Sequence, residues 1–430
     1  MKTFRVSLPV QQPQGTAAGY REPLTLTSQF RFCAIPLRLD SYLGCGYSCT
    51  FCFARHRGGN VDTSSIRPAS PLAIGRILRD SHAGRPGVLR DLVRRQVPIH
   101  FGGMSDPFHQ AEGRHRVSLA FLRTLLEYAH PVIISTRSEL PSQEPYLSLL
   151  RSHPSVVVQY SFSSSIDSVS ARFEGKAPAP SLRLNAMHRL ASAGVNVTVR
   201  WQPYLPNISE CPSLFLPRVA EAGAVHAALE FLKVPLDRNS RLWAQLATAL
   251  QDDPWSWYRR LGATRDGREY VLPPARKLPI IRHFATTARQ LGLTVGIAEN
   301  EFLYLSDGGS CCSGVGLFRG FENYLRHQTS YALSRSHERI TYSSISREWA
   351  PAGSIDRFLN SRCRLTEQSG EVGNLAAHIR NAWNNPNSPG HPGRYYGVQN
   401  TGQFTSSGHA VFRFTRPITR LREEVLGRPP

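Results

Sequence analysis

The stretch Gly44-Cys45-Gly46-Tyr47-Ser48-Cys49-Thr50-Phe51-Cys52 carries three cysteines in one short loop. Three thiolates at this spacing can bind three irons of a [4Fe–4S] cube and leave the fourth iron open to a small molecule. Zinc is the alternative, because His56 follows and could complete a Cys3His site, although zinc ligands usually come in Cys-x2-Cys pairs. A disulfide is disfavoured, because pairing two of these cysteines leaves the third unpaired.

The charge of the chain favours a polyanionic partner. The 430 residues carry a formal net charge of +20, and only four of them are lysine, so nearly all of the positive charge is arginine. A GC-rich genome can explain the choice of arginine over lysine, but not the excess over acidic residues. We therefore expect an arginine-rich surface that binds nucleic acid, including Arg76, Arg79, Arg90, Arg94 and Arg95 of one helical segment.

The sequence contains no sign of secretion or of membrane insertion. Its first residues lack the apolar segment of a signal peptide, and no stretch reaches the roughly eighteen apolar residues that a membrane span requires. Eight cysteines, three of them clustered, fit a reducing compartment better than a disulfide scaffold. We therefore expect a cytoplasmic protein without a membrane partner.

Short apolar runs alternate with helical patterns from about residue 33, which is typical of a parallel α/β fold. The strands are expected at Arg38–Gly44, Pro98–Gly103, Pro131–Thr136, Val156–Phe162, Val195–Trp201 and His226–Leu232, with helices at about 72–95, 113–129, 138–152, 181–193 and 213–222. These units predict a partial (β/α)6 TIM-like barrel. The functional residues of such barrels lie at the C-terminal ends of the strands, and here the cysteine loop follows the first expected strand.

The chain is expected to divide into three parts. Residues 1–30 form an irregular lead-in, residues 31–318 the core, and residues 319–430 a basic, loop-rich C-terminal module. Within the core, residues 236–275 are expected to be a helical insertion. A further helix at 276–291 and an apolar strand at Leu293–Ala298 follow it.

Several short segments follow the strands in a characteristic order. They are Phe53-Ala54-Arg55 after the cysteine loop, Ser105-Asp106-Pro107 after the second strand, Ser135-Thr136-Arg137 at the third, Ser161-Phe162-Ser163 at the fourth, then Glu174, Pro178 and Arg183. Over roughly residues 31–235 this pattern resembles the spore photoproduct lyase-like branch of the radical S-adenosylmethionine (SAM) superfamily. The resemblance implies a [4Fe–4S] cluster on Cys45, Cys49 and Cys52. It further implies reductive cleavage of SAM to methionine and a 5′-deoxyadenosyl radical, and an electron donor such as flavodoxin or ferredoxin.

The same resemblance implies a set of cofactor-binding residues. Phe51 would lie beside the adenine, Arg137 would reach the SAM carboxylate, and the methionine amine would lie at the glycine-rich turn. The full implied set is Phe51, Gly102, Gly103, Met104, Ser105, Asp106, Arg137, Ser161, Ser163 and Arg183. From the residues alone, the glycine-rich segment could instead be a tight turn, and the serines could cap neighbouring helices.

One departure from the pattern concerns the hydrogen donor. Spore photoproduct lyases carry a cysteine where this chain has Gly103, so another group would have to return a hydrogen atom to the product radical. The pair Cys311-Cys312 follows an apolar strand in a glycine-rich loop that is expected to open near the barrel mouth. The pair is thus a candidate hydrogen donor, a candidate ligand of a second cluster, or simply two buried structural residues.

The function that these patterns favour is hydrogen abstraction by a radical SAM enzyme. The arginine excess makes nucleic acid or a nucleotide the first substrate class, for repair or modification. A radical SAM enzyme acting on a peptide or small metabolite is the alternative. A non-catalytic, zinc-bound nucleic-acid-binding protein is the alternative from another class.

Overall fold

The computed structural model describes residues 20, 22–27, 35–56, 66–238, 241–307, 312–324, 328–336, 338–344, 375–388 and 390–428. Its largest sheet has eight strands in the order β1-β2-β5-β6-β7-β8-β9-β13. These are β1 Leu24–Leu26, β2 Leu37–Leu39, β5 Ile99–Phe101, β6 Val132–Thr136, β7 Val156–Phe162, β8 Asn196–Tyr204, β9 His226–Phe231 and β13 Thr294–Ile297. All neighbours pair in parallel except β1, which pairs antiparallel with β2.

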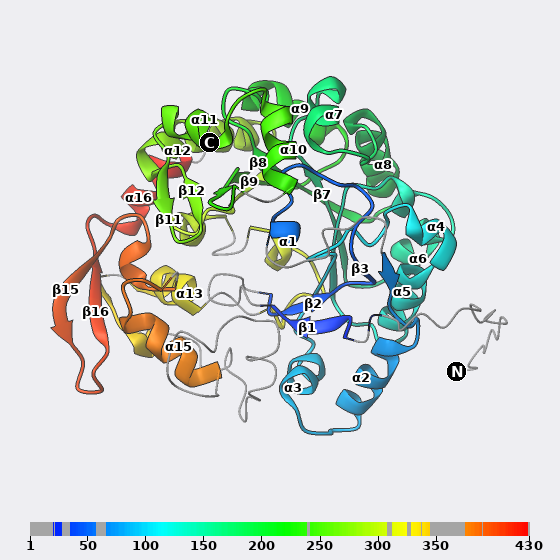
Figure 1. Ribbon diagram of the computed structural model, residues 1–430. Helices are drawn as coiled ribbons and strands as arrows, with labels where there is room; N and C mark the ends of the chain where they lie inside the picture. Colours follow the sequence, from blue (N-terminus) through cyan, green and yellow to red (C-terminus); the bar gives the residue numbers. More distant parts are fainter. Residues whose placement is uncertain are drawn as a thin grey trace.

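Helices cover the outer face of this sheet, and the sheet curves into an open barrel (Figure 1). Between consecutive strands lie α2 Ala73–His82, α3 Val88–Arg94, α4 Ala111–His115, α5 Val117–Glu127, α6 Tyr146–Ser152, α7 Asp167–Phe173, α8 Pro180–Ser192, α9 Pro212–Glu221 and α12 Pro274–Gln290. The expected α/β barrel core is therefore confirmed, with the strand at Leu293–Ala298 present as β13. The expected helix at 72–95 is two helices, because the glycines at 84 and 87 both have positive φ and interrupt it.

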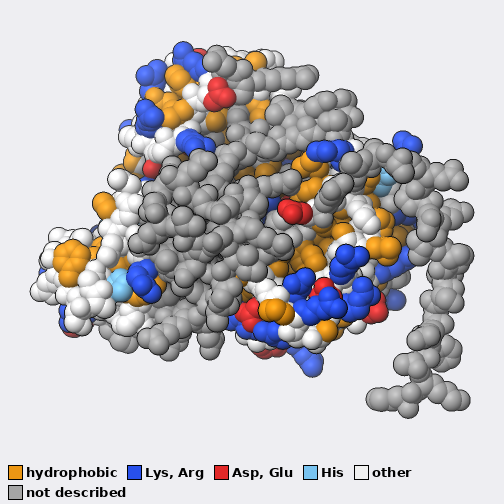
Figure 2. Space-filling view, turned by 60° about the horizontal axis from the view of Figure 1, so that its bottom comes forward, with side chains coloured by type: hydrophobic (Ala, Val, Ile, Leu, Met, Phe, Trp, Pro, Cys, Tyr) orange, Lys and Arg blue, Asp and Glu red, His pale blue; other side chains and the backbone are white. Residues whose placement is uncertain are grey.

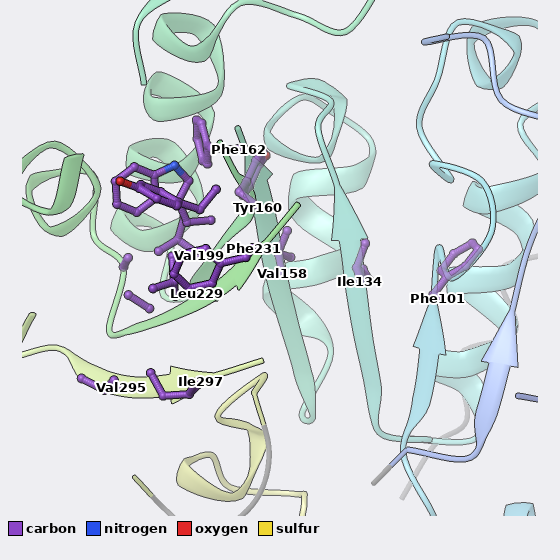
Figure 3. Close-up of a cluster of buried hydrophobic side chains, with 14 of the residues drawn as sticks. Phe101, Ile134, Val158, Tyr160, Phe162, Val199, Leu229, Phe231, Val295 and Ile297 are labelled. Carbon is purple, nitrogen blue, oxygen red and sulfur yellow. The ribbon is translucent and has the colours of Figure 1, made fainter. Parts of the chain in front are cut away.

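The alternation of side chains along each strand separates an apolar face from a polar one. One set of alternating residues packs under the helices and forms the main hydrophobic core; Figure 3 shows Phe101, Ile134, Val158, Tyr160, Phe162, Val199, Leu229, Phe231, Val295 and Ile297 among them. The residues between them point to the concave face, which encloses the barrel lumen. This alternation decides which side chains can reach a ligand inside the barrel.

An apolar plug fills the lower end of the lumen, which is the end where the barrel strands begin. Ile133 and Val157 on the concave face form a separate cluster with Ile35, Val315 and Phe321. Val315 lies in a short 3-10 helix, Val315–Leu317. The plug lies near the N-terminal ends of β6 and β7, so it closes the barrel at the end opposite to the strand ends that carry function in such folds.

The segment expected to be a helical insertion is partly a sheet. It contains α10 Arg241–Leu250 and α11 Pro254–Arg260, but also the strands β10 Val234–Pro235, β11 Thr264–Asp266 and β12 Glu269–Val271. The hairpin between β11 and β12 turns at Gly267, which has a φ of 58°. The expectation of a purely helical segment is therefore wrong, because the Asp266-Gly267 pair is a hairpin signal.

The C-terminal segment packs onto the core. Its described part contains α13 Gln328–Arg335, β14 Arg339–Ile340, α15 Leu375–Asn384, β15 Val398–Phe404, β16 Ala410–Phe414 and α16 Ile418–Leu426. Helix α16 lies against α12, where the Arg282 guanidinium donates to the Glu424 carbonyl and Arg289 donates to the Leu426 carbonyl. The strands β14, β16 and β15 form a small antiparallel sheet at one side of the barrel (Figure 1).

Three short elements follow β2 in the chain. They are the paired strands β3 Tyr42–Leu43 and β4 Arg67–Pro68 and the helix α1 Phe53–His56. The cysteine loop lies between β3 and α1. No described helix is long and apolar enough to cross a membrane.

Candidate active site at the strand ends

The cysteine loop is held in place by backbone contacts with the segment that follows α7. The amide of Thr50 donates to the Phe173 carbonyl at 2.9 Å, and the amide of Lys176 donates to the Tyr47 carbonyl at 2.7 Å. Gly175 lies so close to the loop that an added Cβ would stand 2.3 Å from the Tyr47 carbonyl oxygen. The fold thus fixes the cysteine loop to the end of the β7–α7 unit, at the C-terminal ends of the strands.

The three cysteine side chains of the loop lie close enough for their charges to interact. Cys49 is buried, and Cys45 and Cys52 are half-buried. Burial raises the pKa of Cys45 to about 12, and the nearby Asp106 and Cys52 add to the rise. Burial also raises the pKa of Cys49, while Arg137 opposes that rise. Binding of a metal or cluster to these thiols therefore has to displace protons.

The chemistry of this donor set suits an iron–sulfur cube. In a cube each thiolate binds a different iron, whereas a zinc site draws its sulfurs to about 2.3 Å from a single ion. The side chain of His56, the fourth ligand of the zinc alternative, lies outside the described residues.

Glu174 connects the cysteine loop to the barrel, and its backbone carbonyl accepts a hydrogen bond from the Cys49 thiol at 3.4 Å. Its carboxylate accepts from the Ser163 amide at 2.6 Å and from the Arg183 guanidinium at 2.5 Å, and it faces the Arg137 Nε at 3.8 Å. Burial alone would raise its pKa, but Arg183 and Arg137 hold the pKa of Glu174 below its usual range. Glu174 is therefore a buried anion that positions groups from several elements.

Arg137 lies at the end of β6, where the SAM carboxylate is expected. Its Nη2 donates to the Gln202 carbonyl at 2.8 Å, and its guanidinium carbon lies 5.6 Å from the centre of the Phe51 ring. Its Nε has no hydrogen-bond acceptor among the described residues. Burial works against its charge, but Glu174 and the neighbouring thiols raise the pKa of Arg137, so the guanidinium stays charged. The structure thus brings Arg137, Phe51 and the cysteine loop together.

The glycine-rich turn after β5 lies beside the first barrel strand. The amides of Met104 and Ser105 donate to one carboxylate oxygen of Asp40, at 2.7 and 3.1 Å. Gly102 has a φ of 98°, and a Cβ there would lie 2.5 Å from the Ser135 carbonyl oxygen, so this position requires glycine. At Gly103 a Cβ would lie 2.5 Å from the Arg38 side chain. The turn is close-packed, and Asp40, which the sequence analysis passed over, holds it.

Asp106 is fully occupied by the protein. One carboxylate oxygen accepts from the Phe108 amide at 2.9 Å and from the Thr136 hydroxyl at 2.8 Å, and the other accepts from the Arg137 amide at 2.6 Å. Burial raises the pKa of Asp106, and these donors oppose the rise. Asp106 therefore joins the turn to the end of β6, which is a positioning task rather than an open contact for a ligand.

The two serines at the end of β7 differ in their surroundings. The Ser161 carbonyl accepts from Arg183 at 2.6 Å. Ser163 is fully buried beside Glu174, whose carboxylate accepts from the Ser163 amide at 2.6 Å. Both serines therefore belong to the polar network around Glu174 and Arg183 at the end of β7.

Arg183 lies away from any open position. It is completely buried on α8, where it donates to the Ser161 carbonyl, the Ser170 hydroxyl and the Glu174 carboxylate. Its expected role as a cofactor contact is therefore not supported by its position, because these groups enclose it. Arg183 instead neutralises Glu174.

Cys312 lies at the opposite end of the barrel from the cysteine loop. Its carbonyl accepts a hydrogen bond from the His226 Nε2 at 2.9 Å, and His226 is the first residue of β9. A strand of this length spans about 17 Å at about 3.3 Å per residue. The expectation that the Cys311-Cys312 loop opens at the barrel mouth is wrong for Cys312, which adjoins the plug. Cys311 lies outside the described residues.

Comparison with known proteins gives distant relatives. No family model matches the chain. An uncharacterized protein of Mycobacterium tuberculosis and one of Mycobacterium bovis are each 25% identical to it over 228 residues, or 50% of this chain and 65% of the relative. The chain thus spans just under two thirds of the length of these relatives.

Solved structures with a similar arrangement of elements share little sequence with the chain. Spore photoproduct lyase with bound AdoMet and dinucleoside spore photoproduct is similar at a TM-score of 0.48 and 14% identity, over 67% of this chain and 87% of that one. SuiB of Streptococcus suis bound to S-adenosylmethionine is similar at a TM-score of 0.33 and 14% identity, over 47% of this chain and 41% of that one.

Proposed function

We propose that this chain is a radical SAM enzyme. Cys45, Cys49 and Cys52 would hold a [4Fe–4S] cluster, and SAM would bind between the glycine-rich turn, Arg137 and the end of β7. The observation that carries the proposal is the position of the three-thiol loop. It is fixed at the C-terminal ends of the barrel strands through Glu174, beside a charged guanidinium. The bound cluster would supply the electron that cleaves SAM to methionine and a 5′-deoxyadenosyl radical.

The residues of the chain have distinct tasks in this proposal. Arg137 would pair with the SAM carboxylate, and Ser161 and Ser163 would hydrogen-bond the ribose. Glu174 would keep Arg137 and the end of β7 in position, because it contacts both. Asp40 and Asp106 would fix the backbone of the turn that receives the methionine amine.

The substrate class is inferred from charge. We propose that nucleic acid or a nucleotide is the substrate, supported by the net charge of +20 and by the arginines of α2 and α3. Figure 2 shows Lys and Arg side chains gathered on the face that carries these helices. A peptide or small metabolite is the alternative substrate. A flavodoxin- or ferredoxin-type protein is the proposed electron donor.

Iron analysis of anaerobically purified and reconstituted protein tests the cluster. The wild type should hold about four irons per chain, and Cys45→Ala, Cys49→Ala and Cys52→Ala should each lose most of them. Cys211→Ala is the matched control, because Cys211 is exposed and lies far along the chain, at the start of α9. With dithionite and SAM, the wild type should form 5′-deoxyadenosine. Stoichiometric zinc without iron, or no 5′-deoxyadenosine from iron-loaded protein, would reject the proposal.

A further inference from the structure

The concave face of the barrel carries a polar layer directly above the apolar plug. Ser135, Gln159 and Thr198 stand at paired positions of β6, β7 and β8, so their side chains form one row across the lumen. The residues two positions earlier on β6 and β7, Ile133 and Val157, face the same side and belong to the plug. The polar row therefore lies directly on the apolar residues of the plug.

Two members of this row have polar atoms without partners. Gln159 is 1% exposed and Thr198 is completely buried. The Gln159 Nε2 and the Thr198 Oγ1 have no hydrogen-bond partner among the described residues. A buried donor without an acceptor destabilises the fold, and such groups are uncommon in folded proteins. Side by side on adjacent strands, these two are arranged to bind the same ligand.

Two arginines, on strands at the two sides of this layer, carry positive charge close to it. Arg38 comes from β2 and Arg200 from β8. Both influence His100 of β5, whose Nε2 lies 2.7 Å from the Ser135 hydroxyl. Burial first, and then the charges of Arg200 and Arg38, lower the pKa of His100 to about 4. The charges of both arginines therefore act on His100, although each arginine also pairs with a carboxylate at its own side.

Those carboxylates are already bound by protein groups. Asp40 accepts from two backbone amides and pairs with Arg38 at 3.1 Å, and Glu230 pairs with Arg200 and with Lys233. The groups left for a ligand are thus the amide N–H of Gln159 and the hydroxyl of Thr198, with the charges of Arg38 and Arg200 nearby. A ligand that suits them carries several acceptor oxygens and negative charge.

We propose that this lumen layer binds an oxyanion of the substrate, a phosphate or a carboxylate, through Gln159, Thr198, Arg38 and Arg200. The inference rests on the proposed function only where it calls the ligand a substrate. The evidence for an oxyanion site is independent of that function. A phosphate would come from a nucleotide, and a carboxylate from a peptide or metabolite. The site lies below Arg137, so it is separate from the position proposed for the SAM carboxylate.

Calorimetric titration of the reconstituted protein tests this site, with inorganic phosphate and with acetate as probes at constant ionic strength. We expect saturable binding of at least one probe. Gln159→Leu and Thr198→Val should each weaken it by about ten- to a hundredfold, because each removes a hydrogen bond to a charged group. Stronger binding of phosphate would indicate a nucleotide source, and stronger binding of acetate a carboxylate source.

The controls make the same substitutions elsewhere. Gln399→Leu on β15 and Thr264→Val on β11 remove exposed groups and should leave the titration unchanged. Ser135→Ala is a third lumen variant, in case one of the others fails to fold by circular dichroism. Absence of binding by the wild type, or equal affinity in the lumen variants and their controls, would overturn the inference. Iron content and 5′-deoxyadenosine formation of the wild type test the proposed function separately.

Discussion

At the scale of single residues, Glu174 organises the candidate site. It is buried, it contacts the cysteine loop through its carbonyl, and its carboxylate meets Ser163, Arg183 and Arg137. The sequence predicted the thiols, Arg137 and Phe51 as neighbours, and the structure places these residues together. Glu174 received no role because its partners are distant along the chain or on the next helix, and no local spacing indicates a buried ion pair.

Arg137 gives the sharpest test at this scale. If its guanidinium binds the SAM carboxylate, Arg137→Ala should weaken SAM binding by about ten- to a hundredfold, since a charge-assisted hydrogen bond contributes about 1.5–3 kcal/mol. Arg137→Lys should recover only part of the loss, because an ammonium lacks the planar fork. Equilibrium dialysis of SAM against reconstituted protein measures this. Arg151→Ala, on the exposed side of α6, is the control; an unchanged affinity in the Ala variant would remove Arg137 from the SAM site.

At the scale of elements, the period of the apolar residues was a good predictor of the barrel. The strand Val156–Phe162 has the predicted bounds, and the later barrel strands overlap their predicted ranges. The predicted strand Arg38–Gly44 is wrong as a single strand, because it spans the end of β2 and then β3, which pairs in a separate sheet. The hairpin of β11 and β12 is not predicted because each strand has only three residues, β11 exposed and β12 half-buried, which is too short for an apolar alternation. The contact between the cysteine loop and Gly175 was also unpredictable, because it joins segments more than a hundred residues apart.

That contact leads to a prediction about Gly175. An alanine Cβ would stand 2.3 Å from the Tyr47 carbonyl oxygen and 2.9 Å from the Ser48 carbonyl oxygen, so the cysteine loop has to shift. Gly175→Ala should therefore lower the iron content after reconstitution while leaving far-UV circular dichroism close to that of the wild type. Gly194→Ala is the matched control, because Gly194 also has a positive φ but nothing lies within 4 Å of its added Cβ. Equal iron contents in the two variants would show that the close approach has no effect on the site.

At the scale of the whole molecule, the two ends of the barrel differ in the groups that they carry. The upper end carries the cysteine loop, and the lower end is closed by the plug, the His226 hydrogen bond to Cys312 and the bond from His226 to Thr294. The sequence indicated a loop at Cys311-Cys312, but it did not show which end of the barrel this loop closes. Loops occur at both ends of every strand, so the presence of a loop does not decide between them.

The buried His226 at the lower end should make the free energy of unfolding depend on pH. Burial lowers the pKa of His226 to about 4, below its ordinary value near 6.5. Between these values the unfolded chain binds a proton that the folded chain does not, so the free energy of unfolding falls as the pH drops from 6.5 towards 4. His226→Gln should make this fall shallower by up to about 1.4 kcal/mol per pH unit, measured by urea unfolding. The same slope in His226→Gln, the wild type and the exposed-site control His188→Gln would contradict this account.

The net charge of the molecule gives the last prediction, which concerns nucleic acid. On α2 and α3, Arg94 and Arg95 pair with Asp91, and Arg90 pairs with Asp80. Arg76 and Arg79 are exposed on α2 and should contact phosphates more readily than the paired arginines. If each neutralises one phosphate, Arg76→Gln with Arg79→Gln should reduce the slope of log affinity against log salt by about 1.4–1.8.

Fluorescence anisotropy of labelled single-stranded DNA and RNA over a series of salt concentrations measures that slope. Arg265→Gln with Arg268→Gln removes the same charge from the exposed β11–β12 hairpin and is the matched control. A purely non-specific attraction to the whole positive surface would lower affinity equally in both double variants, because charge alone would decide it. A defined interface on α2 and α3 requires a larger effect there, and failure to bind either polymer at low salt would favour a peptide or metabolite as the substrate.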